Sequence, residues 1–408
     1  MKKIIFVTRC FNPIFNTGAS RSVSDIAFGL AELGWDVHLV VGKQGYQGYK
    51  DNKETEVIRG VCIHRIWNIS FPCSSLLRRL LNYIIFYLSC SYNLIFLVKR
   101  NDIVVVTTDP PLISVVVDLI VRVKRAILIN WLLDIYPEVA QRLGFRLIQG
   151  WRLKLFRSIC NISWKKAVYN MVLGERMAQF VYSVGIENEK VRVFPNWEDG
   201  DLIKPTPVKE KNNFREQWGL QNKFVIGYFG NMGRAHEFET ILDTAAHLRS
   251  CKETENIIFL FVGDGYYRRH IEKMIQLREL ENVILKSYQA EEKLSESFAA
   301  ANIHIISTRP NLEGLLVPLK LYGAMAAGRP IIFVGDHEGE IAKIARKYHC
   351  GSTVNVGKVQ DLKETILSYY SCPEMCEQLG RNARVAFETY FNKSIAIKRW
   401  HGLLETIE

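Results

Sequence analysis

The stretch Glu313-Gly-Leu-Leu-Val-Pro-Leu-Lys-Leu-Tyr-Gly-Ala-Met-Ala-Ala-Gly-Arg-Pro330 lies between two apolar runs, Ile303–Ile306 and Ile331–Val334, which we predict to be buried strands. We expect a helix that opens at Pro318, because proline is tolerated where its missing N–H would have no partner. Its first turn carries Lys320, and exposed N–H groups at a helix start attract anions. With the carboxylate that begins the stretch, the segment can hold a sugar hydroxyl and a diphosphate side by side.

Apolar runs alternate with helix-length segments along the rest of the chain. Before residue 200 we predict strands at Ile4–Thr8, Val37–Val41, Ile103–Val106, Ile127–Leu132, Val168–Leu173 and Val191–Phe194. After it we predict strands at Phe224–Phe229, Ile257–Val262, Val283–Leu285, Ile303–Ile306, Ile331–Val334 and Ser352–Val356. Nearly continuous apolar strands that alternate with helices indicate parallel sheets covered on both faces.

The two series of strands are separated by the polar, proline-containing segment Asn196–Asn213, which we interpret as a linker. A chain of 408 residues is long for one domain and suits two of roughly 150–200 residues each. We therefore predict an α/β protein with two doubly wound domains, residues 1–203 and 214–391. Because ligands of open parallel sheets bind beyond the carboxyl ends of the strands, we expect the site in a cleft between the two domains.

The net charge of +11 is concentrated in the first half of the chain. Residues 1–200 contain 26 Lys and Arg against 16 Asp and Glu, whereas the remainder contains 27 against 26. This asymmetry indicates an anionic partner for the first half, either nucleic acid or a membrane surface. We expect no nucleic acid, because no binding motif is recognised and the aromatic residues accompany aliphatic ones rather than forming a base-stacking array.

Nine cysteines are scattered without a CxxC pair or an accompanying histidine cluster. This pattern favours a reducing compartment with buried thiols and predicts no zinc site. The start of the chain, Met1–Thr8, runs directly into a predicted strand and has no small-residue cleavage site. We therefore expect no signal peptide and a cytoplasmic protein.

The stretch Glu313–Pro330 resembles a segment of the retaining glycosyltransferases of family 4. Glu313 resembles the first residue of the family's Glu–seven residues–Glu segment, and Met325-Ala-Ala-Gly-Arg-Pro330 resembles its ending. Pro318-Leu-Lys-Leu-Tyr322 is similar to a branch of bacterial capsule, O-antigen and exopolysaccharide transferases that includes L-fucosamine transferases. One departure is clear: Gly323 stands where the family has its second Glu, the residue used on the nucleotide ribose.

The resemblance implies a donor site in the second half of the chain. Gly230-Asn-Met-Gly-Arg234 resembles the loop that faces the nucleotide sugar, with its arginine on the diphosphate; the wider family's Lys-Gly is replaced by His236, Glu237 and Phe238. Gly263-Asp-Gly265 borders the donor in the family, although a tight turn alone would also explain its glycines. The donor residues implied are Gly230, Gly233, Arg234, Gly263, Asp264, Gly265, Tyr288, Glu313, Gly314, Val317, Pro318, Lys320 and Leu321.

The resemblance also implies an acceptor site in the first half. Gly18-Ala19-Ser20 resembles the family's N-terminal glycine loop near the transferred sugar, and Asp134-Ile-Tyr136-Pro-Glu138 resembles a segment at the floor of the cleft. Two carboxylates four residues apart can orient an acceptor hydroxyl or take up its proton. The alternative is a helix with Asp134 as its N-cap and Glu138 in its first turn.

A membrane surface is the anionic partner that the first half favours. Leu80–Val98 is nineteen residues without a charge, which is long enough to span a bilayer, although we favour a helix that dips into the interface. Arg78-Arg79, Lys99-Arg100 and the basic aromatic stretch Phe145–Arg157 fit an anionic surface, where each charge contributes on the order of 1 kcal/mol. A solvated basic face is the alternative.

Taken with the family, these features imply the GT-B architecture, in which two Rossmann-like domains face each other across a cleft and a C-terminal helix, here 392–408, packs back on the first. The expected activity is a metal-independent, cofactor-free hexosyl transfer from a nucleotide-diphosphate sugar, a UDP-sugar, to a polyprenyl-diphosphate-linked saccharide. Retention would proceed by front-face attack, with the leaving phosphate accepting the proton. The catalytic residues implied are Arg234, Lys320, Glu313 and Asp134.

Two other functions remain open. A nucleotide-sugar 2-epimerase shares the two-domain fold but needs no acceptor and no membrane, which the basic, apolar-rich first half argues against. A non-catalytic polysaccharide-assembly subunit with a decayed donor site would explain Gly323 in place of the second Glu.

Overall fold

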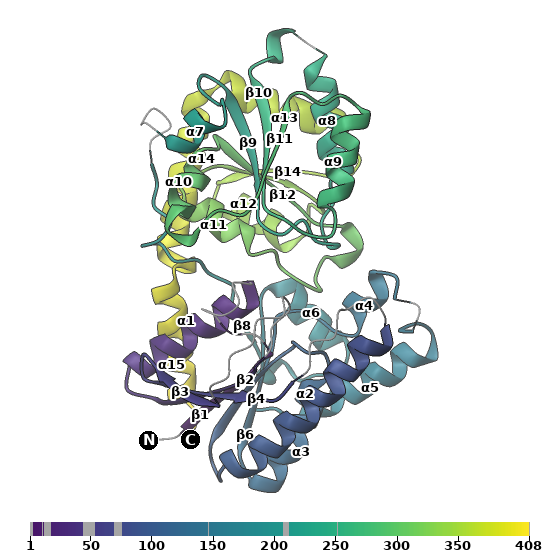
Figure 1. The fold of residues 1–408 in the computed structure, drawn as a ribbon, viewed down its shortest axis with the longest axis vertical. Coiled ribbons are helices and arrows are strands. Elements are labelled where there is room, and N and C mark those ends of the chain that lie inside the picture. Colours follow the sequence, from purple (N-terminus) through teal and green to yellow (C-terminus); the bar gives the residue numbers. More distant parts are fainter. Residues whose placement is uncertain are drawn as a thin grey trace. The chain divides into compact units, whose positions relative to one another are not determined.

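The apolar runs of the sequence form two separate sheets in the computed structural model of the chain (Figure 1). The structure describes residues 3–9, 11, 18–43, 54–68, 76–145, 147–206, 212–250 and 252–407. The chain divides into two units: the first comprises Met1–Pro195, Gly314–Leu316 and Ala396–Glu408, and the second Asn196–Glu313 and Val317–Ile395. Each is an α/β unit with a Rossmann-like layout, as the sequence predicted.

The sheet of the first unit has the strand order β3-β4-β2-β1-β5-β6-β7-β8. Its strands are β1 Lys3–Val7, β2 Asp36–Gly42, β3 Thr55–Ile58, β4 Val61–Ile66, β5 Ile103–Thr107, β6 Ile127–Leu132, β7 Tyr169–Val172 and β8 Val191–Val193. Neighbours pair in parallel except β3 and β4, which are antiparallel. The six predicted strands are confirmed within one or two residues, but β3 and β4 were missed, because Cys62, His64 and Arg65 interrupt the apolar run.

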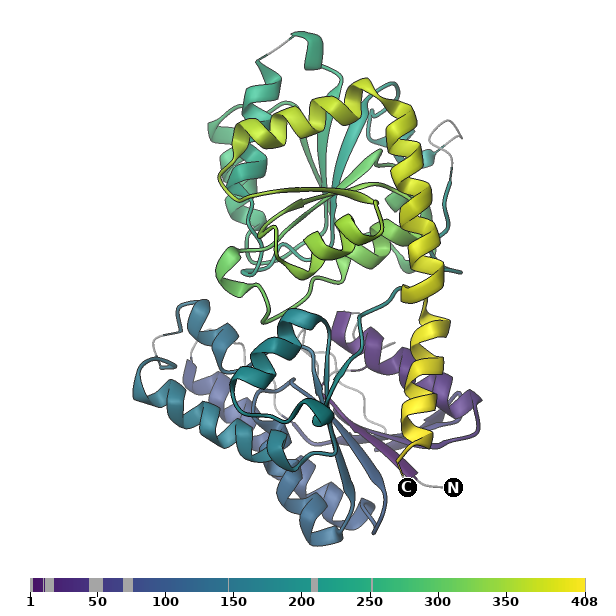
Figure 2. The same ribbon diagram turned by 180° about the vertical axis from the view of Figure 1, so that it is seen from behind.

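Helices cover both faces of this sheet (Figures 1 and 2). The helices are α1 Gly18–Glu32, α2 Leu76–Leu97, α3 Ile113–Lys124, α4 Glu138–Arg142, α5 Trp151–Lys166, α6 Glu175–Ser183 and α15 Lys393–Glu405. On one face, Phe86, Cys90 and Leu94 of α2 pack with α3 against Ile5 and Val7. On the other face α15 lies beside α1, as Figure 2 shows, and its Trp400 contacts the ring of Phe6.

The second unit contains a wholly parallel sheet with the order β11-β10-β9-β12-β13-β14. Its strands are β9 Phe224–Phe229, β10 Ile257–Val262, β11 Val283–Lys286, β12 Ile303–Ser307, β13 Ile331–Val334 and β14 Gly351–Val354. All six predicted strands of this half are confirmed. The chain runs outward from β9 to β11 and returns to β12 beside β9, so the strand order reverses between β9 and β12. Ligands of such sheets bind where the order reverses, beyond the carboxyl ends of the strands.

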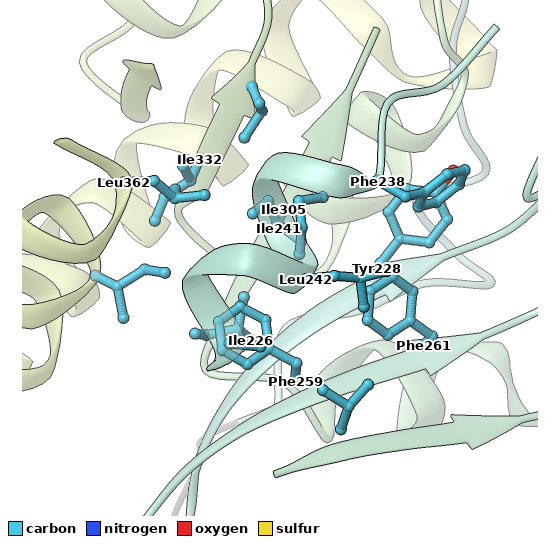
Figure 3. Packing of buried hydrophobic residues seen from close by; sticks show 14 of the residues in the cluster. Ile226, Tyr228, Phe238, Ile241, Leu242, Phe259, Phe261, Ile305, Ile332 and Leu362 are labelled. Atoms are coloured by element: carbon cyan, nitrogen blue, oxygen red, sulfur yellow. The ribbon is translucent and has the colours of Figure 1, made fainter. Parts of the chain in front are cut away.

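The core of the second unit lies on both faces of its sheet. Its helices are α7 Asn213–Gln217, α8 Glu239–Arg249, α9 Arg268–Leu277, α10 Leu294–Ala299, α11 Lys320–Ala326, α12 Glu340–Lys347, α13 Val359–Ser371 and α14 Pro373–Ala386. Figure 3 shows Ile241 and Leu242 of α8 packed with Ile226, Phe259 and Leu362. This packing supports β9 and β10 beneath the loops that follow them.

One boundary within the stretch Glu313–Pro330 differs from its prediction. The helix begins at Lys320 with Leu319 as its N-cap, two residues later than the predicted start at Pro318. It has seven residues, and Leu321–Ala326 are buried. The macrodipole of so short a helix is small, so any attraction for an anion here rests mainly on the charge of Lys320.

Candidate functional site

Two glycine turns interlock beyond the carboxyl ends of β9 and β10. The N–H of Gly230 donates to the carbonyl of Val262 at 2.8 Å, and the N–H of Met232 donates to the carbonyl of Asp264 at 2.7 Å. Gly263 and Gly265 have φ values of 148° and 144°, and a Cβ on Gly263 would overlap the carbonyl oxygen of Gly230. The glycines are therefore required by close backbone approach, whether or not a ligand is bound.

Lys320 lies over this pair of turns. Its Nζ donates to the carbonyl of Asn231 at 2.8 Å, lies 2.8 Å from Nε2 of His236 and stands 4.8 Å from the ring centroid of Tyr228. A Cβ on Gly230 would lie 3.4 Å from Cε of Lys320, so the glycine leaves room for the lysine stem. The side chain retains partial access to solvent, and desolvation by its surroundings lowers the pKa of Lys320 to about 7.

His236 fixes the position of that ammonium group. Its Nδ1 is 2.7 Å from the carbonyl of Ser307, which can only accept, so Nδ1 carries the proton and Nε2 accepts from Lys320. Burial, together with the charge of Lys320, lowers the pKa of His236 to about 3 and keeps the ring neutral. The sequence pattern treated His236 only as a departure from the family's Lys-Gly, and nothing in its spacing indicated this role.

Arg234 is the second cation of the loop. Its side chain is exposed, and its guanidinium carbon lies 3.9 Å from the ring centroid of Tyr266. Arg268 and Arg309, both missed by the sequence, also lie at this edge: Arg268 donates to the carbonyl of Gly263 at 2.6 Å, and Arg309 contacts the hydroxyl of Tyr267. Four cationic side chains therefore gather beyond the strand ends, which is an arrangement suited to an anion.

The carboxylate of Glu313 lies at the start of α12. Its Oε1 accepts the N–H of Glu340 at 2.9 Å, and a Cβ on Gly339 would lie 2.8 Å from the same carboxylate. An acidic group here is favoured by the exposed N–H groups of the helix start. The other predicted members of the stretch include Gly314, with φ of 75°, and Val317, Pro318 and Leu321, which are all buried.

Phe298 occupies the space beside Gly323. A Cβ on Gly323 would lie 2.8 Å from Cε1 and Cζ of the phenylalanine, closer than real Cβ contacts. The ring of Phe298 in turn packs on Phe229 at 5.0 Å and on His304 at 5.2 Å between centroids. The absence of a second Glu is therefore matched by an aromatic side chain in the place that its stem would need.

Tyr288 and Asp264 complete the predicted donor residues. The ring of Tyr288 is 56% exposed, and its hydroxyl is hydrogen-bonded to the backbone of Asp264. The carboxylate of Asp264 accepts the N–H of Gly265 at 2.7 Å. An exposed aromatic ring beside the glycine turns offers a stacking surface for a flat ligand group.

Asp134 of the first unit follows β6. Its backbone N–H donates to Oγ1 of Thr108 at 3.2 Å, and desolvation, with a smaller contribution from Asp109, raises the pKa of its carboxyl to about 6. The N-cap of α4 is Pro137, so Asp134 does not cap the helix that follows. A carboxylate that titrates near neutral pH is suited to proton transfer.

Glu138 has a partner within the first unit. Nε of Arg157 donates to its Oε1 at 2.7 Å, and Nη2 of Arg157 donates to the carbonyl of Tyr136 at 2.9 Å. The two charged side chains are 12% and 11% exposed. The pair therefore ties the turn after β6 to α5, which is a structural role that the sequence did not indicate.

The predicted glycine loop falls partly at the start of α1. The helix begins at Gly18 and includes Ala19, whose side chain lies outside the described part of the structure. Ser20 is buried, and its carbonyl accepts from Oγ of Ser24 at 2.8 Å. Residues 12–17, which precede the loop motif, lie outside the described residues.

An apolar surface covers α2, α3 and α5, which lie side by side (Figure 1). Within the described part of the chain, one helix is long and apolar enough to cross a membrane, Leu80–Leu97, and 22% of this window is buried. The exposed apolar residues are Leu80, Leu81, Ile84, Leu88, Tyr92, Ile95 and Phe96 on α2, Leu119 and Val123 on α3, and Trp151, Leu155 and Ile162 on α5. We call these twelve residues the apolar surface.

Basic side chains accompany the apolar surface. Arg122, Arg152, Lys154, Lys165 and Lys166 are exposed on α3 and α5. Many exposed apolar side chains on neighbouring helices, with exposed cations on two of the same helices, are unusual for a face that meets only water.

The second unit is similar to a known protein family. Residues 210–386 match the family model described as "Glycosyl transferases group 1". The chain carries a glycosyl transferases group 1 domain. This match confirms the resemblance that the motifs between Gly230 and Pro330 indicated.

The chain is also similar to individual proteins and solved structures. "Probable glycosyltransferase WbjE" of Pseudomonas aeruginosa is 26% identical over 253 residues, which is 60% of each chain. The chain thus spans less than two thirds of the length of this curated relative. Solved structures cover more: Anabaena HepE in complex with UDP has a TM-score of 0.74 at 17% identity over 100% of both chains. WaaG, a glycosyltransferase involved in lipopolysaccharide biosynthesis, has a TM-score of 0.69 at 18% identity over 97% of this chain and 98% of its own.

These likenesses confirm the predicted GT-B fold class. The glycine turns, Lys320, His236 and Arg234 all lie inside the group 1 domain, whereas Asp134, Glu138 and the apolar surface lie outside the matched residues.

Proposed function

We propose that this chain is a retaining glycosyltransferase that moves a sugar from a UDP-sugar to a polyprenyl-diphosphate-linked saccharide during the synthesis of a bacterial surface polysaccharide. The observation that carries the proposal is the position of Lys320, held by His236 over two interlocked glycine turns, with Arg234 on the same loop. The UDP bound to HepE and the lipopolysaccharide role of WaaG, both structural neighbours, support the choice of donor and pathway class.

The donor chemistry follows from the charges at this edge of the sheet. As the bond between sugar and diphosphate breaks, negative charge grows on the leaving oxygen. Arg234 would grip oxyanions through a planar, permanently charged fork, and Lys320, when protonated, would add an ammonium group held by His236. Cations that are already positioned stabilise this charge without reorganising and without a metal ion. Glu313 would hold hydroxyls of the donor sugar.

The acceptor chemistry rests on Asp134. With a pKa of about 6, its carboxyl is mostly ionised at pH 7 but remains basic enough to orient and polarise an acceptor hydroxyl. In front-face retention the leaving phosphate takes the acceptor proton, so no covalent nucleophile is needed. Glu138 contributes by holding the turn through Arg157.

The apolar surface supports a lipid-linked acceptor. Polyprenyl carriers reside in the bilayer, so an enzyme that uses them gains by resting on a leaflet. Apolar side chains of α2 that enter the interface and basic side chains of α5 that meet anionic headgroups would hold the first unit there. A soluble epimerase would have no use for such a surface, which favours the transferase.

A thermal-shift screen tests the donor site. UDP, GDP, ADP and CMP are compared with and without EDTA on the wild type, on Lys320→Ala and on a control, Lys252→Ala. Lys252 precedes the amino end of β10, away from the glycine turns. We expect UDP to raise the melting temperature of the wild type and the control, with or without EDTA, because saturation at 100 times Kd stabilises by about 2.7 kcal/mol.

Two results of this screen would contradict the proposal. A shift that disappears with EDTA would replace the two-cation account with a metal-dependent one. No shift with any nucleotide would favour the non-catalytic subunit, for which Phe298 beside Gly323 is the supporting observation.

A further inference from the structure

Two histidines and a cysteine meet on neighbouring strands of the first unit, in a place that the proposed function does not use. His38 lies on β2, and Cys62 and His64 lie on β4. The strands pair in parallel with His38 opposite Cys62. Side chains alternate along a strand, so Cys62 and His64, two residues apart, project from the same face of the sheet.

The ligand atoms of these three residues lie close enough together to bind one metal ion after small side-chain movements. All of them lie within 4.8 Å of one another. Nδ1 of His38 is 2.8 Å from Nε2 of His64, and Sγ of Cys62 is 3.5 Å from the same nitrogen. Around a tetrahedral zinc ion, bonds of about 2.0–2.3 Å place neighbouring nitrogen and sulfur ligands roughly 3.3–3.7 Å apart. Small side-chain rotations would bring the trio to those separations.

The surroundings of the trio also fit a metal. Oδ1 of Asp36 lies 3.2 Å from Nε2 of His38, the ring nitrogen that faces away from His64. Metal-binding histidines usually donate their second N–H to a carboxylate or carbonyl in this way. The nearby ammonium of Lys3 is matched by Asp102 at 3.2 Å and donates to the carbonyl of Leu97 at 2.6 Å. All three candidate ligands are partly buried, which limits competition from water.

We propose that His38, Cys62 and His64 form a binding site for a transition-metal ion of the Zn²⁺ class, with the fourth coordination position open to water or a small ligand. Two nitrogens and one thiolate are the ligand set that such ions prefer. The site joins β2 to β4, and β4 pairs with the exposed edge strand β3, so the ion fastens this edge of the sheet.

The site is separate from the predicted acceptor residue Asp134 of the same unit. Asp134 and Thr108 follow the carboxyl ends of β6 and β5, whereas His38 is the third residue of its strand. The sequence predicted no zinc site because no CxxC pair and no histidine cluster was visible. The two histidines are 26 positions apart, and only the pairing of β2 with β4 brings them together.

Cobalt and zinc binding to the tag-free, chelator-treated full chain tests the site. We expect one equivalent of Co²⁺ to give a thiolate-to-metal charge-transfer band together with tetrahedral ligand-field bands. We expect Zn²⁺ to displace it and to raise the melting temperature. Cys62→Ser should lose the charge-transfer band, and His38→Ala or His64→Ala should weaken binding at least about tenfold. Cys372→Ser and His270→Ala, both in the second unit, serve as matched controls and should behave as the wild type.

A second measurement needs no variant and so remains valid if a substitution impairs folding. Zn²⁺ should protect Cys62 from alkylation by iodoacetamide in the wild type, as mapped by peptide mass spectrometry. Cys372 should be alkylated equally with and without the metal. The proposal is overturned if Co²⁺ gives no charge-transfer band, if Cys62→Ser retains it, or if Zn²⁺ leaves the alkylation of Cys62 unchanged.

Discussion

At the scale of single residues, the proposed donor site depends on Lys320 and on the neutral histidine that holds it. His236 accepts from Nζ through Nε2 and donates through Nδ1 to Ser307. Desolvation brings the pKa of Lys320 down from 10.5 to about 7, so below pH 7 the side chain is mostly a cation and above pH 7 it is mostly neutral. A bound diphosphate favours the cation, so binding takes up a proton wherever the free lysine is neutral.

This linkage predicts a pH dependence of UDP affinity. Between pH 7 and pH 9 the Kd for UDP should rise, by up to about tenfold per pH unit, since each unit removes most of the remaining cation. Lys320→Arg should show a nearly flat profile, because guanidinium stays charged throughout. Titration calorimetry in two buffers of different ionisation enthalpy measures both the Kd and the proton uptake. A wild-type Kd that is constant over this range would contradict the assignment of Lys320 to the diphosphate.

Gly323 gives a second prediction at this scale. Gly323→Ala should destabilise the second unit by about 1–3 kcal/mol, because its Cβ would lie 2.8 Å from the ring of Phe298. Phe298→Leu should offset part of that loss when the two are combined. Chemical denaturation of the single and double variants measures the coupling. Additive losses would show that the two positions are independent and that the ring does not exclude a side chain at 323.

At the scale of elements, the strands whose ends were predicted most accurately are those that are completely buried. The apolar strands β9, β10, β12 and β13 were found at or within a residue of their ends, since strands buried on both faces leave a continuous apolar run. β3 and β4 were missed, because an edge pair with mixed exposure carries no such run. The start of α11 was predicted two residues early because Pro318 resembles a first helical residue.

The anchoring of α15 to the first unit is testable. Trp400 is fully buried, and its ring lies 4.8 Å from that of Trp131, 6.1 Å from that of Phe6 and 5.8 Å from that of Phe194. Trp400→Ala should cost about 3–5 kcal/mol of the free energy of unfolding. Urea denaturation followed by circular dichroism measures it. Trp151→Ala, at a tryptophan that is 69% exposed, is the matched control and should cost little. Equal costs for both variants would contradict the anchoring role.

α2 gives the prediction for the membrane. Leu88→Glu and Phe96→Glu replace side chains that are 68% and 71% exposed, so they should leave folding intact and weaken binding to anionic vesicles. Val385→Glu, at an exposed valine of α14, is the control and should bind as the wild type does. Vesicle sedimentation at low and high salt measures the effect, and added salt should weaken the electrostatic part. Unchanged binding of both α2 variants would assign the apolar surface to another partner.

At the scale of the whole molecule, the fold class and the family of the second unit could be predicted from motifs, and the partners of individual side chains could not. Arg234, Lys320 and the glycine turns could be proposed from the sequence because each lies in a contiguous motif. The contacts of Lys320 with His236 and of Glu138 with Arg157 join residues 84 and 19 positions apart, which no local pattern links. For the same reason the sequence did not indicate the trio of His38, Cys62 and His64, which only the pairing of β2 with β4 brings together.

The central claim is that Arg234 and Lys320 together stabilise the leaving diphosphate. The most direct test is the initial rate of sugar release from a panel of UDP-glucose, UDP-galactose and UDP-N-acetylglucosamine, in EDTA, on anionic vesicles that carry a polyprenyl-diphosphate saccharide. We predict that Arg234→Ala and Lys320→Ala each lower kcat by about 10²–10³ on the sugar that the wild type uses, while Lys252→Ala leaves it unchanged. Wild-type turnover by both Arg234→Ala and Lys320→Ala would contradict the account.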